Sequence, residues 1–234
     1  MDPSRYALVA GMSDTRATLG AWRAAPWAAL RPWLLGSLAV AVGLLYAVWV
    51  IARTQTPDPG VYRLPGLTEP ATLGAVGHVL FRNSLVLALH SMACVAGFIA
   101  GSSLPLQAEQ HSGIWRRVHE KAGPMAIAFV VGATAFSLCT QAYVLGGGAS
   151  SLAAQLHVSP ATLMLTLLPH AVPELVALFL PLAAWMVASR RGDWHQLLAA
   201  TVVTTVLAAP VLVAAALVEV LLWPELLRSV SPVA

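Results

Sequence analysis

The sequence predicts an all-α protein, a polytopic membrane bundle of five transmembrane helices. Of its 234 residues, 58% are hydrophobic and only 10% are charged, and the mean hydropathy is +0.75. Soluble domains carry about 25% charged residues. A span through a bilayer core of about 30 Å needs about 20 apolar residues, and five stretches meet that need. An ordinary soluble domain and a disordered chain are therefore excluded.

Three uncharged stretches predict the first three spans. The first runs from Pro32 to Ala52, and the second runs from Asn83 to about Pro105. The third covers about Met125 to Leu145. It is expected to end there because Gly146-Gly147-Gly148 and the following Ser150-Ser151 are typical of an exposed loop.

The fourth and fifth predicted spans contain ionisable residues and several prolines. The fourth follows Ser159-Pro160 and continues through His170 and Glu174 to Ser189, and the fifth runs from about Leu197 to Trp223. Proline inside a helix removes a hydrogen bond and clashes with the preceding turn. We therefore expect kinks or restarts in these helices at Pro169, Pro173, Pro181 and Pro210, which a membrane bundle tolerates when neighbours satisfy the freed carbonyls.

Outside the spans, the sequence predicts short segments and no soluble domain. Residues 1–31 form a cytoplasmic or interfacial segment, in which the arginines and tryptophans of residues 13–31 are typical of a helix lying among lipid head groups. Residues 32–226 form the membrane domain, with an irregular external loop over residues 54–79. Residues 227–234 form an external tail.

The basic residues predict the orientation of the bundle, because cytoplasmic loops of membrane proteins are enriched in Lys and Arg. Nine of the 13 basic residues lie in the N-terminal segment, the second loop and the fourth loop, and four lie on the opposite side. With five spans, the N-terminus is therefore expected in the cytoplasm and the C-terminus outside, and the protein is expected in the inner (cytoplasmic) membrane.

Ionisable residues inside spans are costly, so they are the first candidates for a functional site. His170 and Glu174 are four residues apart, which places them on one face of the fourth span. At 1.5 Å per residue, Glu174 lies at about the same depth as Glu219 of the fifth span, in the outer part of the membrane. The sequence thus predicts an intramembrane polar cluster of Asn83, Gln141, His170, Glu174 and Glu219. His90 is expected about two helical turns deeper in the membrane.

Three chemical interpretations of this cluster are open. A divalent metal ion could be held by His170, Glu174 and Glu219, because imidazole and carboxylate are ligands for zinc, manganese or iron. The same side chains could transfer protons, as in coupled transporters. In the third interpretation the cluster is a structural lock, in which buried Glu and His satisfy each other and the backbone groups freed by the prolines.

A Gly-x-x-x-Gly pattern on the second span predicts close helix packing. Gly97 and Gly101 lie on one helix face, where small residues let a neighbouring helix approach. We expect this face to pack within the bundle rather than to form a homodimer, although a homodimer is the alternative.

No motif of an enzyme or of a nucleic-acid-binding protein is present. The sequence has no Gly-x-Ser-x-Gly, no His-Glu-x-x-His and no Walker loop. The basic residues form no patch with interleaved aromatic residues outside the loops that flank the membrane, so no nucleic acid partner is expected. A non-enzymatic function is therefore favoured, and catalytic residues are not expected.

The segment Pro169-His170-Ala171-Val172-Pro173-Glu174-Leu175 resembles the Pro-His-Gly-x-x-Glu-Leu segment of the stage II sporulation protein M family. In that family a last span with a glutamate follows, which Glu219 matches, and Phe81-Arg82-Asn83-Ser84 resembles the start of its Asn-bearing second span. The similarity covers roughly residues 75–225. Here Ala171 replaces the usual Gly, Pro173 is added, and Ser84 replaces a common second Asn.

The resemblance implies a multi-pass subunit of a bacterial peptidoglycan-remodelling complex that recruits or positions cell-wall hydrolases. The expected function is therefore a membrane scaffold or assembly subunit of a cell-envelope complex, with membrane lipid and other envelope membrane proteins as partners. The alternative is a transporter, or a metal- or proton-binding membrane protein, that uses His170, Glu174 and Glu219. A third alternative is an intramembrane enzyme that acts on lipid.

Overall fold

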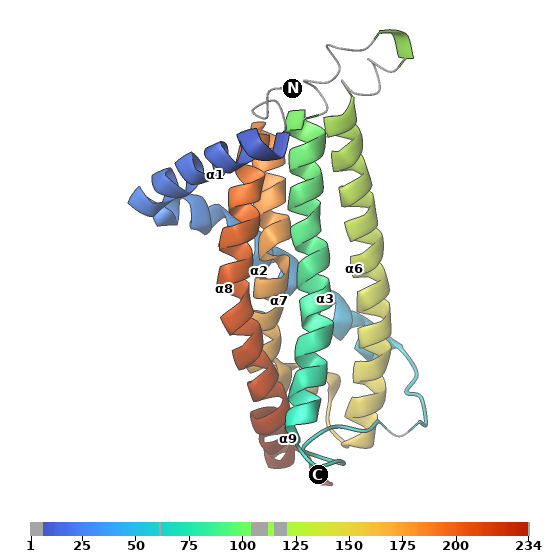
Figure 1. Cartoon of the computed structure of the whole chain (residues 1–234). Helices are drawn as coiled ribbons and strands as arrows, with labels where there is room; N and C mark the ends of the chain where they lie inside the picture. The colour runs from blue at the N-terminus through green and yellow to red at the C-terminus, as the bar shows by residue number, and fades with distance from the viewer. Residues whose placement is uncertain (1–6, 61, 104–111, 115–120, 234) are drawn as a thin grey trace. The chain divides into compact units, whose positions relative to one another are not determined.

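The computed structural model describes residues 7–60, 62–103, 112–114 and 121–233, and in this part of the chain the regular structure is helical. Five helices are long and apolar enough to cross a membrane, which confirms the predicted all-α membrane bundle. They are the long ribbons of Figure 1. Their bounds are α2 Pro26–Thr54, α3 Leu73–Phe98, α6 Ala122–Gln155, α7 Pro160–Arg191 and α8 Leu197–Leu217.

The first span begins earlier than the sequence indicated. Helix α1 covers Ala7–Ala24, and α2 starts at Pro26 rather than at Pro32. A proline suits a helix start, because its fixed φ is helical and its missing N–H would have no partner there. The ring of Trp22 in α1 lies edge-on to the ring of Trp33 in α2, with 5.0 Å between the centroids.

The second span also begins earlier than predicted, at Leu73 instead of Asn83. Thr72 caps this helix, since its Oγ1 accepts a hydrogen bond of 3.1 Å from the backbone N–H of Ala75. The prediction placed the membrane boundary at Arg82 because a charge usually ends a span. Arg82 instead lies inside α3, about 14 Å along the helix axis from its start.

The predicted loop at Gly146-Gly147-Gly148 is wrong, because α6 continues through it to Gln155. These glycines allow close packing rather than a turn. A Cβ on Gly146 would lie 2.5 Å from Ile51 Cγ2 and 3.1 Å from the carbonyl oxygen of Val48. The hydroxyl of Ser150 donates a hydrogen bond of 2.9 Å to the carbonyl of Gln55, so this stretch of α6 is covered by α2 and the loop that follows it.

The last two spans do not restart at their prolines. Helix α7 is continuous, and it begins as predicted at Ser159-Pro160, where Ser159 Oγ accepts a hydrogen bond from the N–H of Thr162. Helix α8 contains Pro210 and ends in a π-helical turn, η4 (Val218–Leu222). Helix α9 (Trp223–Val230) follows directly, so the helical structure extends past the predicted end at Trp223 into the predicted tail.

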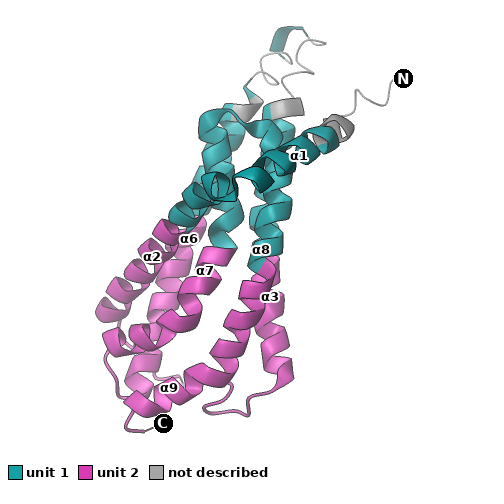
Figure 2. Ribbon diagram, turned by 90° about the vertical axis from the view of Figure 1, so that its left-hand side faces the viewer, with its two compact units in different colours: residues 1–37, 86–134, 178–208 teal, residues 38–85, 135–177, 209–234 magenta. Residues whose placement is uncertain are grey.

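The chain divides into two compact units, coloured separately in Figure 2. Unit 1 comprises residues 1–37, 86–134 and 178–208, and unit 2 comprises residues 38–85, 135–177 and 209–234. A core cluster of unit 1 consists of Trp33, Leu180, Ala183, Ala184 and Ala200. A core cluster of unit 2 consists of Val76, Ala216 and Val220.

Three arginines that helped to predict the orientation, Arg5, Arg116 and Arg117, lie outside the described residues. The orientation with the N-terminus in the cytoplasm therefore stays a prediction.

In unit 1, the Gly-x-x-x-Gly face of α3 receives two tryptophan rings. A Cβ on Gly97 would lie 2.5 Å from Trp185 Nε1, and one on Gly101 would lie 2.0 Å from Trp194 Cδ2. Gly101 belongs to the π-helical turn η2 (Ile99–Ser103) that follows α3. This face is therefore in close contact with other residues of the same chain.

Replacing Gly97 by alanine is expected to destabilise the protein by about 1–3 kcal/mol, because Trp185 is buried and cannot move away from the added methyl group. Gly132→Ala in α6 is the matched control, since nothing lies within 4 Å of its added Cβ. There the gain in helix propensity should stabilise by a few tenths to 1 kcal/mol. Thermal unfolding in detergent measures the stability of both variants. Equal changes in stability in Gly97→Ala and Gly132→Ala would contradict the close packing at Gly97.

Candidate functional site

A cavity of about 400 Å³ lies in unit 2 among α2, α6, α7, η4 and α9. Apolar side chains form most of its wall. Its polar lining includes His170 and Glu174 of α7 and Glu219 of η4. This is the composition of a typical ligand pocket, which is mostly apolar with a few polar groups. We refer to it as the apolar cavity.

The local structure of two helices brings these three side chains to one wall. His170 and Glu174 are one helical turn apart in α7, so both point to the same side. Glu219 lies in the π-helical turn η4, and such turns occur frequently at functional sites. His170, Glu174 and Glu219, which the sequence placed in one cluster, therefore line one cavity in unit 2.

His170 is fixed by aromatic packing, not by hydrogen bonds. Its side chain is 4% exposed, and its ring lies 5.3 Å from the ring of Trp223, centroid to centroid. Trp223 is held in turn, because its Nε1–H donates a hydrogen bond of 3.2 Å to Thr166 Oγ1. The Nδ1 atom of His170 is buried and has no hydrogen-bond partner. An unpaired buried polar atom costs about 1–3 kcal/mol, so this atom is a candidate for binding a hydrogen-bond donor.

The two carboxylates are half-buried and interact with each other. Arg82 of α3 acts electrostatically on both of them. The side-chain amide of Asn83 also lies close enough to interact with the carboxylate of Glu174. The buried Nδ2 atom of Asn83 makes no hydrogen bond of normal geometry. If Glu174 and Glu219 are both ionised, the nearby guanidinium balances one of the two charges.

Two of the predicted cluster residues lie elsewhere. Gln141 is not part of the cavity wall, and its Nε2–H donates a hydrogen bond of 2.9 Å to Ser137 Oγ in the same helix. His90 belongs to unit 1, where its Nδ1 lies 2.7 Å from the carbonyl oxygen of Leu178 and its ring lies 5.5 Å from that of Phe179. His90 is therefore a packed core residue with a partner.

The geometry bears on two of the chemical interpretations. Within the described part of the chain, no group of three or more His, Cys, Asp and Glu side chains could hold a metal ion. The arrangement thus gives no support to a metal site at His170, Glu174 and Glu219. The structural lock required His and Glu to satisfy each other, but His170 Nδ1 is left without a partner.

A second cavity, of about 300 Å³, lies on the other side of Glu219 in unit 2. Its wall combines charged residues of the loop after α2 with residues of α3, among them Arg63, His78 and Arg82. Glu219 and Trp223 line both cavities. We refer to this one as the polar cavity, and these two residues separate it from the apolar cavity.

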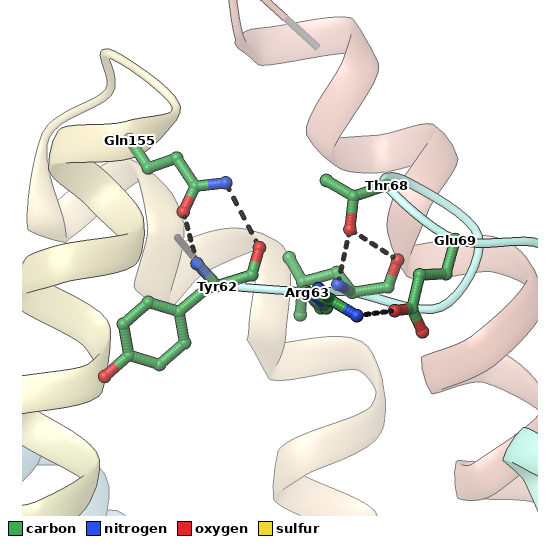
Figure 3. Close-up of polar contacts among 6 residues, drawn as sticks. Tyr62, Arg63, Thr68, Glu69 and Gln155 are labelled. Atoms are coloured by element: carbon green, nitrogen blue, oxygen red, sulfur yellow. Dashed lines mark hydrogen bonds and ion pairs between the residues drawn. The ribbon is translucent and has the colours of Figure 1, made fainter. Parts of the chain in front are cut away.

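The loop after α2, residues 55–72, is fastened to unit 2 by side chains of α6. Gln155 makes two hydrogen bonds to Tyr62, since its Oε1 accepts from the backbone N–H at 2.8 Å and its Nε2–H donates to the carbonyl at 3.2 Å (Figure 3). Ser151 Oγ accepts a hydrogen bond of 2.8 Å from the backbone N–H of Asp58.

A tight turn shapes the middle of this loop. Thr68 Oγ1 accepts a hydrogen bond of 2.8 Å from the N–H of Leu64, and Arg63 pairs with Glu69 at 3.6 Å (Figure 3). Gly66 lies in the turn with a φ of +83°, and its carbonyl accepts a hydrogen bond from Arg228 of α9. The loop is thus part of the folded unit, although its described residues contain no helix and no named strand.

Sequence reasoning missed Arg82, Trp223 and Gln155 as site residues. Arg82 was counted only as a topological signal, and Trp223 only as a residue at the membrane interface. A signal for Arg82 existed. Thr72 can cap a helix, Arg82 lies nine positions after the start of that helix at Leu73, and an ionisable residue inside a span is a functional candidate. Gln155 had no signal, since its role depends on loop contacts that are remote in sequence.

No protein-family profile, no curated protein and no solved structure matches this chain. The fold and the site define a five-span helical membrane protein with a mostly apolar cavity whose wall contains two carboxylates. The resemblance to the stage II sporulation protein M family stays a prediction from the sequence.

Proposed function

We propose that this chain is a non-enzymatic, multi-pass assembly subunit of a cell-envelope complex in the cytoplasmic membrane of a bacterium, related to the stage II sporulation protein M family. In this role it presents the loop of residues 55–72 and helix α9 to extracytoplasmic partner proteins that remodel peptidoglycan. The single observation that supports the proposal most is the fastening of this loop, which gives the end of unit 2 a defined surface.

An assembly subunit needs an ordered surface, because ordering a loop on binding costs free energy that weakens the complex. In this chain the cost is already met by contacts within unit 2. The loop is held to α6 through Gln155 and Ser151 and to α9 through Arg228. Its exposed groups include Pro59, Gly60 and Arg63, which are available to a partner.

Gln155→Ala is expected to release the loop and to weaken assembly. The substitution removes two hydrogen bonds worth about 0.5–1.5 kcal/mol each, so hydrogen exchange of residues 55–72 should become roughly tenfold faster. Complementation of a deletion strain should fail although the membrane level of the protein is normal. Gln141→Ala is the matched control, because it changes the same residue type in the same helix without touching the loop.

Two results would contradict the proposal. Absence of any envelope defect in the deletion strain would exclude the envelope function itself. Full complementation by Gln155→Ala, with loop exchange measurably faster, would show that the ordered loop is not the assembly surface.

The second candidate function is movement of a proton or a cation through unit 2. It is favoured by one observation, the position of Glu219 in the walls of both the polar and the apolar cavity. Glu219→Gln keeps the size of the side chain and removes its charge. Transport by the protein in liposomes, lost in this variant while folding is retained, would favour this candidate over the assembly role.

A further inference from the structure

We propose that the apolar cavity binds an aminolipid, an amphiphile with an alkyl chain and a primary ammonium head group that is placed between Glu174, Glu219 and His170. This inference goes beyond the assembly role and does not depend on it. It rests on the shape and lining of the cavity, the charge at its wall, and one buried atom without a partner.

The apolar part of the wall fits an alkyl chain. Leucine, valine, alanine and methionine side chains from α2, α6 and α7 form it, and its volume of about 400 Å³ is in the range of small-molecule sites. The cavity is partly open, and exposed apolar residues form its rim, among them Val144 at 64% and Leu145 at 49% exposure. In a membrane such a rim faces hydrocarbon, so an alkyl chain can enter from the bilayer.

The polar part of the wall selects a cation with several donors. Glu174 and Glu219 are acceptors when ionised, and Arg82 balances only one of their charges. An ammonium group supplies three donors and one positive charge. Two donors can go to the carboxylates. The third can go to His170 Nδ1 once the ring turns this buried atom, which has no partner, towards the cavity that the residue lines.

Other amphiphiles fit less well. A fatty acid would place a third carboxylate beside Glu174 and Glu219, and like charges at short range repel. A plain alkyl chain would leave His170 Nδ1 without a partner. A phosphoethanolamine head group ends in the same ammonium group, with its phosphate on the side of the alkyl chain, so it is a second possible source of this cation.

Binding can be measured by native mass spectrometry of the full-length protein released from non-ionic detergent. The probes are dodecylamine, dodecanol, dodecanoate and a lysophosphatidylethanolamine with a chain of the same length. We expect one amine per chain, bound at least tenfold more tightly than dodecanol and dodecanoate. Tighter binding of dodecylamine identifies a bare ammonium as the ligand group, and tighter binding of the lysolipid identifies a phosphoethanolamine.

Two matched variants test the location. Gly148→Leu fills the cavity, since Gly148 lines it and an added Cβ makes only ordinary contacts with Tyr62, the nearest at 3.6 Å. Gly43→Leu is the control, because its added Cβ has nothing within 4 Å and its surroundings are exposed. We expect Gly148→Leu to weaken amine binding at least tenfold and Gly43→Leu to leave it unchanged.

The charge is tested by Glu174→Gln and Glu219→Gln, each of which should weaken amine binding about tenfold or more while binding of dodecanol changes little. The selectivity between the two probes remains informative even if a variant is less stable. Equal binding of all four probes to the wild type, or equal loss in Gly148→Leu and Gly43→Leu, would overturn the proposal.

Discussion

Replacing Gly66 by alanine is expected to release the loop of residues 55–72 from unit 2. Gly66 has a φ of +83°, a conformation that costs an L-residue about 1–2 kcal/mol. An added Cβ would also lie 2.6 Å from Pro224 Cγ and 2.8 Å from the carbonyl oxygen of Val220. A backbone oxygen cannot rotate away, so overpacking adds about 1–3 kcal/mol. The total, about 2–5 kcal/mol, is comparable to the free energy that several loop hydrogen bonds supply.

Gly192→Ala separates the conformational cost from the steric cost. Gly192 also has a positive φ, of +76°, but nothing lies within 4 Å of an added Cβ. Only the cost of about 1–2 kcal/mol should remain. Limited proteolysis and hydrogen exchange of the loop, with thermal unfolding of both variants, measure the difference. A Gly66→Ala protein whose loop stays as protected as in the wild type would contradict the close contact with Pro224 and Val220.

The sequence was sufficient to predict five spans, because their lengths and their lack of charge leave few alternatives. It was insufficient for the helix ends. Arg82 suggested a membrane boundary, but the cap at Thr72 starts the helix ten residues before Asn83. The glycine triplet suggested a loop, yet a helix tolerates glycine where a neighbour such as Ile51 needs the space.

The candidate site was predicted in part for a similar reason. The spacing of His170 and Glu174 and the depth of Glu219 are properties of regular helices, so helical geometry could bring them together in advance. The depth of a residue in the membrane does not tell which way its side chain points around the helix axis. Gln141 has a fitting depth, but it hydrogen-bonds along its own helix to Ser137. The apolar cavity depends on packing among α2, α6, α7, η4 and α9, and no local sequence pattern specifies this packing.

His170→Phe is expected to stabilise the protein and to weaken aminolipid binding. Phenylalanine keeps an aromatic ring against Trp223 and removes the buried Nδ1 atom that has no partner. Because leaving such an atom unpaired costs about 1–3 kcal/mol, unfolding in detergent should shift to higher temperature by several degrees. Amine binding should fall about tenfold, since one of the three acceptors proposed for the ammonium is lost.

His170→Ala serves as the contrasting variant. It removes the ring that packs on Trp223 and enlarges the cavity, so it should destabilise by about 3 kcal/mol. If His170 serves packing alone, His170→Ala should be destabilised, whereas His170→Phe should be as stable as the wild type or more so and should bind the amine equally well. If His170 also binds the ligand, amine binding should be weaker in both variants, whether the variant is more or less stable than the wild type. If His170→Phe is more stable than the wild type and binds dodecylamine equally well, then Nδ1 is not an acceptor for the head group, and the carboxylates alone must hold it.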